Sequence, residues 1–303
     1  MRIASTQYHS TMNSALQTAA ARLETTMQKM ASGERMRVPS DDPIGSVRLA
    51  RLAREEAALD QYRDNIGALR ARLTQNETLL DGISRDMLAA RDLLVWAADG
   101  GNTSDDVRAM AGSLRTLVEG IHFAANSRDQ EGRYLFSGTA SATETIVRDD
   151  AAAAGSRYAF AGNTSEQNVM VGNGVAQTAN VSLDEIAALL NQLDRAAETL
   201  GTPGVNPNDP AVRGELVAAL DGVDVGLASV LGKIAGLGGT QNILETLETN
   251  HANVSLSNKH AALDIGQLDY GDAAVKLNGY TAALQATQKA YAQVSKLSLF
   301  DVL

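Results

Sequence analysis

Three pairs of adjacent aspartates are the residues most suited to chemistry in this sequence, because neighbouring carboxylates can share a metal ion. The pairs are Asp41-Asp42, Asp105-Asp106 and Asp149-Asp150. A calcium-binding loop would place further oxygen ligands at fixed positions after the first carboxylate, and none of the three pairs has that spacing. Aspartate also caps helix starts and favours turns. We therefore expect these pairs to shape the backbone and to bind no metal.

The remaining reactive side chains are few and scattered. The sequence has no cysteine, which excludes disulfides, thiolate–metal sites and a cysteine nucleophile. His122 has no histidine or glutamate four residues later, so we interpret it as an ordinary surface or interface residue. Gly172-Asn173-Gly174 lacks the third glycine of a dinucleotide fingerprint and is typical of a hairpin turn. We expect no enzyme and no cofactor, because nucleophile–base pair, phosphate loop and metal set are all missing.

Composition and charge favour long helices over a thick globular core. The 303 residues include 49 alanines, aromatic residues make up only 4%, and the net charge is −10. Basic and acidic side chains are interleaved, as on a solvated helix surface, so we expect no nucleic-acid partner. No apolar run approaches the length of a membrane span, and residues 1–10 contain no apolar stretch of a secretory signal peptide.

Residues 39–43 carry a strong helix-start signal. They read Pro39-Ser40-Asp41-Asp42-Pro43. Either aspartate can cap the helix, and proline suits the first helical position. From there an apolar residue recurs every seven positions, at Leu52, Leu59, Ile66, Leu73, Leu80, Met87 and Leu94. This period predicts a long helix that supercoils with a partner, with a polar interruption of the seam at Asn76.

Short β-type runs separated by glycines interrupt the helical pattern in the middle of the chain. We expect a mostly α protein in which N- and C-terminal segments form a long antiparallel coiled-coil bundle with a small inserted β-rich outer domain. The predicted domains are 1–40 with 262–303, 41–136 with 183–261, and 137–182. Ser104 and Ser182 are predicted helix caps, the second in a capping box with Glu185. A break is predicted at 236–239, and a kink or a break at 278–279, where glycines occur.

Both ends of the sequence resemble the flagellin family of bacterial axial proteins. The motifs that carry the resemblance are the opening Met1–Gln7, the segment Met30–Arg35, the helix start with Pro43, Gly132–Gly138, and the ending Ala282–Lys289 with Leu297–Asp301. Filament subunits typically have alanine where this chain has Pro43, so the branch that forms the hook–filament junction is more similar. The resemblance covers about 1–138 and 240–303 and is weak over 139–235.

The resemblance implies a structural subunit of the flagellum, exported unfolded by the flagellar type III system and assembled head-to-tail outside the cell. It implies as partners other copies of the chain, the neighbouring hook-junction protein, flagellin and a cytoplasmic export chaperone, with no insertion into a membrane. Two alternatives stay open. One is a filament flagellin, which differs mainly at Pro43 and Gly132–Gly138, and the other is a soluble enzyme on a helical scaffold.

We expect the terminal helices to carry the assembly contacts and to order only on assembly, because their apolar stripes are thin. The predicted assembly residues are Leu16, Leu23, Met27, Met30, Leu277, Leu284, Tyr291, Leu299 and Phe300. A second stripe suits a chaperone groove and consists of Leu277, Tyr280, Leu284, Tyr291 and Val294.

Overall fold

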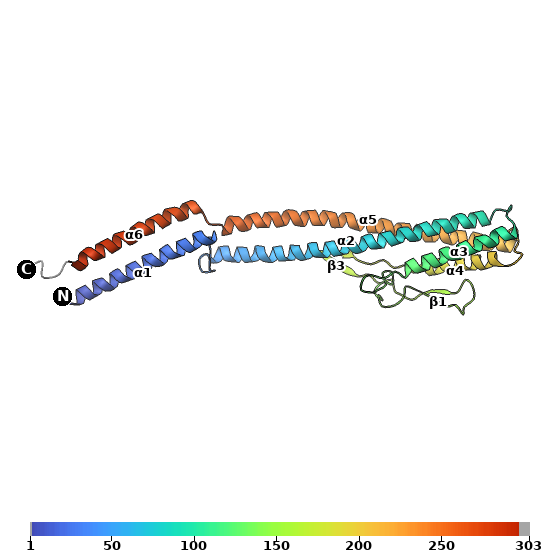
Figure 1. Ribbon diagram of the computed structural model, residues 1–303, viewed down its shortest axis with the longest axis horizontal. Coiled ribbons are helices and arrows are strands. Elements are labelled where there is room, and N and C mark those ends of the chain that lie inside the picture. The colour runs from blue at the N-terminus through green and yellow to red at the C-terminus, as the bar shows by residue number, and fades with distance from the viewer. Residues whose placement is uncertain (1, 297–303) are drawn as a thin grey trace, which may run out of the picture. The chain divides into compact units, whose positions relative to one another are not determined.

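The computed structural model describes residues 2–296, which form six helices and two β-hairpins (Figure 1). The helices are α1 (Arg2–Ser32), α2 (Pro43–Ala97), α3 (Ser104–Ala125), α4 (Ile186–Gly201), α5 (Pro210–Gly266) and α6 (Tyr270–Lys296). The chain divides into two compact units. The terminal unit comprises 1–59 and 252–303, and the body unit comprises 60–251. The prediction of a mostly helical fold with a small β-rich insert is confirmed.

In the body unit, α2 and α5 run antiparallel, which their cross-links show. Arg70 on α2 forms an ion pair with Glu248 at 2.9 Å. Further along α2, Arg91 pairs with Asp224 at 2.7 Å, so the α5 position moves backward as the α2 position moves forward. The seven-residue seam of α2 is buried here, with no exposed surface at Ile66, Leu73, Leu80, Met87 and Leu94. The heptad therefore identified the inward face of α2 correctly.

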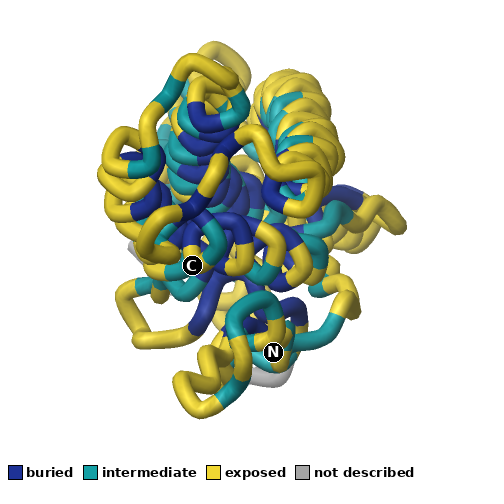
Figure 2. Tube along the Cα trace, turned by 90° about the vertical axis from the view of Figure 1, so that its right-hand side faces the viewer, coloured by how far each residue is buried: buried dark blue, intermediate teal, exposed yellow. Residues whose placement is uncertain are grey.

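The helices α3 and α4 complete the helical core of the body unit. The inward residues of α3 include Leu114 and Ile121, and those of α4 include Leu190 and Leu193, all at most 1% exposed. Figure 2 shows this arrangement from one end, with buried segments on the inner sides of the helices and exposed segments outside. Four helices can thus bury several aliphatic layers although the chain has few aromatic residues.

Two separate hairpins make up the β-rich insert. Strand β1 (Ile146–Arg148) pairs antiparallel with β2 (Tyr158–Phe160), and β3 (Asn168–Gly172) pairs with β4 (Val175–Thr178). The predicted turn at Gly172-Asn173-Gly174 lies between β3 and β4. Two histidines attach the hairpins to the helices. The Nε2 atom of His122 lies 3.0 Å from the Ile146 carbonyl oxygen, and that of His251 lies 2.8 Å from the Val171 carbonyl oxygen.

The predicted break at 236–239 is wrong, because α5 runs through it, and α6 also runs through 278–279, which excludes a break there but not a kink. A helical glycine costs only about 1 kcal/mol relative to alanine. Burial of neighbouring side chains, such as Leu237 at 5% exposure, outweighs that cost. The chain breaks at 267–269 instead, between α5 and α6.

The two predicted helix caps, at Ser104 and Ser182, are also wrong. Thr103, not Ser104, caps α3 and forms a capping box with Asp106. Glu185 does not complete a capping box with Ser182, because its carboxylate binds the Lys233 ammonium at 2.6 Å. The ion pair with the distant Lys233 therefore replaces the capping interaction predicted for Glu185. No helix among residues 2–296 is long and apolar enough to span a bilayer.

Candidate functional site

The terminal helices α1 and α6 form an antiparallel pair (Figure 1). Near the start of α6, the Tyr270 hydroxyl donates a hydrogen bond to the Met30 carbonyl oxygen at 3.2 Å. Toward the other end, the Tyr291 hydroxyl lies 3.2 Å from Nδ1 of His9, and the two rings meet edge to face. These two contacts tie the helices along most of their length.

The seam of this helix pair is only half-buried. The predicted stripe residues Leu16, Leu23 and Met30 of α1 and Leu277, Leu284 and Tyr291 of α6 all keep part of their surface exposed. Met27 is 56% exposed and lies off the seam. Among the described side chains of the pair, Ala273 of α6 is the apolar residue that is almost fully covered, at 3% exposure. Two thin helices leave room for a third surface, because neither can enclose the other.

The two chain connections of the terminal unit are tied to each other. Glu34, which follows α1, and Gln267, which follows α5, form an antiparallel β-bridge. The Arg35 amide donates to the Gly266 carbonyl at 2.8 Å, and the Leu268 amide donates to the Gly33 carbonyl at 3.0 Å. Gly33 has φ +75°, a left-handed conformation that lets the chain leave α1 without strain. The connections therefore form a fixed corner.

The helix-start motif lies beside this corner and works as predicted. Asp42 caps α2, because its Oδ1 accepts from the Gly45 amide at 2.9 Å, and Pro43 is the first helical residue. Asp41 instead pairs with Lys29 of α1 at 3.0 Å. The Gly45 amide lowers the pKa of Asp42, and the Lys29 hydrogen bond lowers the pKa of Asp41. Both carboxylates are thus held ionised by the local structure.

The rest of the motif and the corner's arginine complete this start of α2. Pro39 and Ser40 form the exposed turn before the cap. Arg35 donates from Nε to the Ile265 carbonyl at 2.9 Å and from a terminal nitrogen to Asp42 at 2.9 Å. One guanidinium therefore joins the end of α5 to the start of α2, a role that the sequence analysis did not assign.

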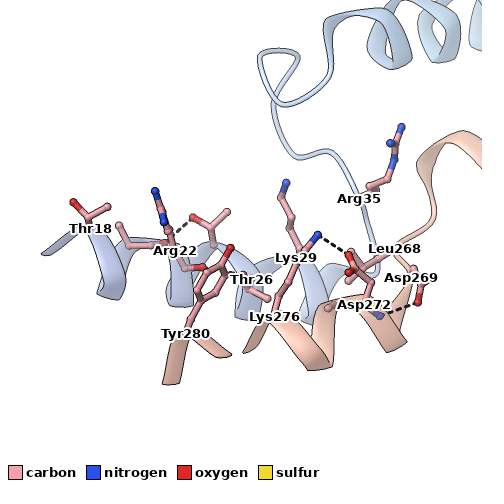
Figure 3. A pocket seen from close by; sticks show the side chains of 13 residues that line it. Thr18, Arg22, Thr26, Lys29, Arg35, Leu268, Asp269, Asp272, Lys276 and Tyr280 are labelled. Atoms are coloured by element: carbon pink, nitrogen blue, oxygen red, sulfur yellow. Dashed lines mark hydrogen bonds and ion pairs between the residues drawn. The ribbon is translucent and has the colours of Figure 1, made fainter. Parts of the chain in front are cut away.

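A hollow of about 660 Å³ opens along one side of the α1–α6 pair (Figure 3). Thr18, Arg22 and Tyr280 lie toward one end of it. Lys276 and Asp272 form an ion pair at 2.6 Å toward the other end. The lining mixes small, hydroxylated and charged side chains, which suits the side chains of another helix better than a reactive small molecule. Among residues 2–296, no cluster of histidine and acidic residues could hold a metal ion.

The predicted chaperone stripe is the face that α6 turns toward α1. Leu277, Tyr280, Leu284 and Tyr291 are all half-buried, and Tyr280 lines the hollow with residues of α1. The side chain of Val294 lies outside the described part of the chain, as do Leu299 and Phe300. The same stripe therefore cannot contact α1 and fill a chaperone groove at once.

Asp269 is a helix cap of the terminal unit that the sequence analysis did not identify. Its Oδ1 accepts hydrogen bonds from the Gly271 amide at 2.8 Å and the Asp272 amide at 3.1 Å, so it caps α6. The signal was present, since an aspartate directly before a helical segment is a typical N-cap. The sequence analysis placed the interruption at Gly279 instead, ten residues after Asp269.

Comparisons with known proteins agree with this architecture. Residues 3–141 match the model of the bacterial flagellin N-terminal helical region. Over 292 residues, the chain is 26% identical to flagellar hook-associated protein 3 of Escherichia coli (strain K12), covering 91% of both chains.

Solved structures extend the agreement. The chain is 31% identical to a flagellar hook-associated protein from Vibrio parahaemolyticus, with a TM-score of 0.67, covering 75% of this chain and all of that one. Hook-associated protein 3 of Legionella pneumophila is 13% identical with a TM-score of 0.63, covering 71% of this chain and 99% of that one, and shares the fold. The chain therefore belongs to the flagellar hook-associated proteins.

Proposed function

We propose that this chain is a structural subunit of the bacterial flagellum, located outside the cell, that joins the hook side to the flagellin filament. The observation that carries the proposal is the half-buried α1–α6 pair, whose seam residues keep exposed apolar surface. Such a surface is stable when neighbouring subunits cover it. The names of the relatives support a hook-associated position.

Assembly follows from the shape of this surface. In the assembly we propose, the open side of the helix pair meets a different part of its neighbour, which gives a head-to-tail contact that continues around a layer. The partners are other copies of the chain within the layer, the hook-junction protein on one side and flagellin on the other. The match to hook-associated protein 3 over 91% of the chain favours this role over that of a filament subunit.

The α6 stripe would serve two partners in turn, an export chaperone before export and α1 after it. A chaperone that holds Leu277, Tyr280, Leu284 and Tyr291 in a groove would keep α6 from pairing with α1 before export. The chain has no cysteine, so no disulfide opposes passage in an unfolded form. Release outside the cell would then free α6 to fold against α1 and neighbouring subunits.

The function is tested by deleting the gene in its own host. We expect cells that still build hooks but release flagellin into the medium, and we expect the intact gene to restore filaments. The control is a copy that lacks residues 262–303, which should restore nothing. Normal filaments on the deletion strain would overturn the proposal.

Two measurements on the purified monomer test the finer steps. Hydrogen exchange should show weak protection in residues 2–32 and 270–296 and strong protection in the body unit. Strong protection at both termini would contradict ordering on assembly. Removal of 262–303 should abolish binding of the export chaperone, and unchanged binding would reject the stripe as its site.

A further inference from the structure

The first turns of α2 expose a face on which aliphatic and cationic side chains follow one another. We call this face the arginine strip and define it as Ile44, Val47, Arg48, Arg51 and Arg54. Ile44 is 69% exposed and Val47 is 68% exposed, and the three arginines are exposed as well. Steps of three and four residues place all five on one side of the helix, over about 15 Å.

The three arginines form no ion pair within the described part of the chain, and three carboxylates in the same region bind other cations. Lys29 binds Asp41, Arg35 binds Asp42, and Lys259 binds Glu56 on another face of α2. Glu55 is the one acidic residue on the same side as the strip. Like charges three residues apart weaken a helix slightly. The strip thus carries a small cost that an acidic partner would remove.

The acidic surface that complements the strip lies in the body unit of the same sequence. Residues 60–251 contain 26 acidic and 14 basic residues, a net charge of −12, whereas the rest of the chain is net +2. On α5, no basic residue occurs between Arg213 and Lys233. Within that interval Val217, Asp221 and Val225 recur every four residues and are exposed, with Val225 at 72%.

We infer that the arginine strip docks a second copy of this chain, through the α5 face of Val217, Asp221 and Val225. The inference rests on the proposed function, in which copies assemble in a layer. Ile44 and Val47 would pack on the two valines while an arginine pairs with Asp221. Such a contact joins two different surfaces of identical chains and is therefore head-to-tail. Its charged part guides orientation and weakens as salt screens it.

The test uses flagella from the producing bacterium, with Ala58→Cys as a photochemical probe. The sequence has no cysteine, so a benzophenone reagent attaches at this exposed position alone, in line with the strip and without loss of an arginine. We expect illumination to link the probe to a second copy of the chain, within residues 214–232. Thr164→Cys, exposed in the β-rich insert, is the matched control and should give no such adduct. Adducts with another flagellar protein, or none above the control, would overturn the inference.

Charge reversal then tests the electrostatic part. In the probe background, Arg51→Glu or Asp221→Arg alone should lower the adduct yield roughly threefold to tenfold, and the two together should restore much of it. Equal yields in all four variants would overturn the pairing. Failure here is distinct from failure of the proposed function, because filament retention by cells with the unaltered chain is measured separately.

Discussion

The body unit and the terminal helices are built from similar side chains, yet they differ in how many surfaces cover each helix. In the body unit, α2 is covered by other helices, and Leu73 and Leu80 have no exposed surface. In the α1–α6 pair, equivalent leucines such as Leu16 and Leu284 remain partly exposed. Amphipathic sequence alone therefore does not decide whether a helix is stably folded, because the number of neighbours sets how much apolar area is buried.

This difference in burial gives the two regions different requirements for folding. The body unit can keep its fold in the free chain, because its core is complete. We propose that the terminal pair gains further contacts from neighbouring subunits, which would couple its folding to assembly. Substitutions at matched residues in the two regions test whether the number of covering surfaces sets the stability of each helix.

The largest expected effect is in the body unit. Leu80→Ala removes a fully buried side chain and leaves a cavity between helices, so it should lower the free energy of unfolding by about 2–5 kcal/mol. Urea denaturation followed by circular dichroism measures the loss. Exposed Leu88→Ala on the same helix is the control and should cost much less. Equal losses would show that the body core is not the stable part of the chain.

The contrast explains what the sequence could predict. A seven-residue period identifies one face of a helix, and the body unit buries that face from Ile66 to Leu94. The helix-start motif was equally informative, because proline and aspartate act through their own backbone neighbours. Local chemistry therefore predicted both the long seam and the start of α2.

Features that depend on distant partners could not be predicted in the same way. Lys233 lies 48 residues from Glu185 and takes it out of the expected capping box. The corner contact between Glu34 and Gln267 joins segments more than 200 residues apart, and neither segment carries a sequence signal that predicts its partner. The break at Gly279 failed because packing of α6 against α1 outweighs the weak helix preference of glycine.

A second prediction concerns the polar interruption of the body seam. Asn76 is fully buried, and neither atom of its amide has a hydrogen-bond partner among the described residues. Replacement by leucine should raise the free energy of unfolding by roughly 1–2 kcal/mol, because an unpaired amide is costly in a core. Asn65→Leu is the matched control, since Asn65 donates to the Met170 carbonyl at 2.8 Å and its loss should destabilise. A destabilised Asn76→Leu variant would show that the core of the body unit needs this amide.

A third prediction moves the same kind of change to the terminal pair. Leu284→Ala should lower the stability of the free chain by about 1 kcal/mol or less, because the side chain is only half-buried. In cells the same variant should release flagellin into the medium, as the deletion strain does, since neighbouring subunits would lose the surface that Leu284 offers them. Val275→Ala, 72% exposed on the same helix, is the control. Normal filaments with Leu284→Ala would remove this leucine from the assembly surface.

The smallest expected effect is the loss of stability at the helix caps of the two regions as the pH falls. Hydrogen bonds lower the pKa of Asp42 in the terminal unit and of Asp106 in the body unit, chiefly from the Gly45 amide and the Thr103 side chain. Folding therefore favours the ionised carboxylates. Their contribution is complete above the unfolded pKa, near 3.8, and is lost as the pH falls through the lower folded values.

Exchange protection of the amides that these caps bind should follow that titration. The Gly45 and Thr103 amides, which donate to the Asp42 and Asp106 carboxylates, should keep constant protection above about pH 4 and lose it below. Asp42→Asn retains a capping oxygen without the charge, so Gly45 should become less sensitive to pH in this window. Asp106→Asn should do the same for α3, but with a smaller loss of protection, because the buried core continues to hold that helix. A larger loss at α3 than at α2 would contradict the view that completeness of burial, rather than local capping, separates the two regions.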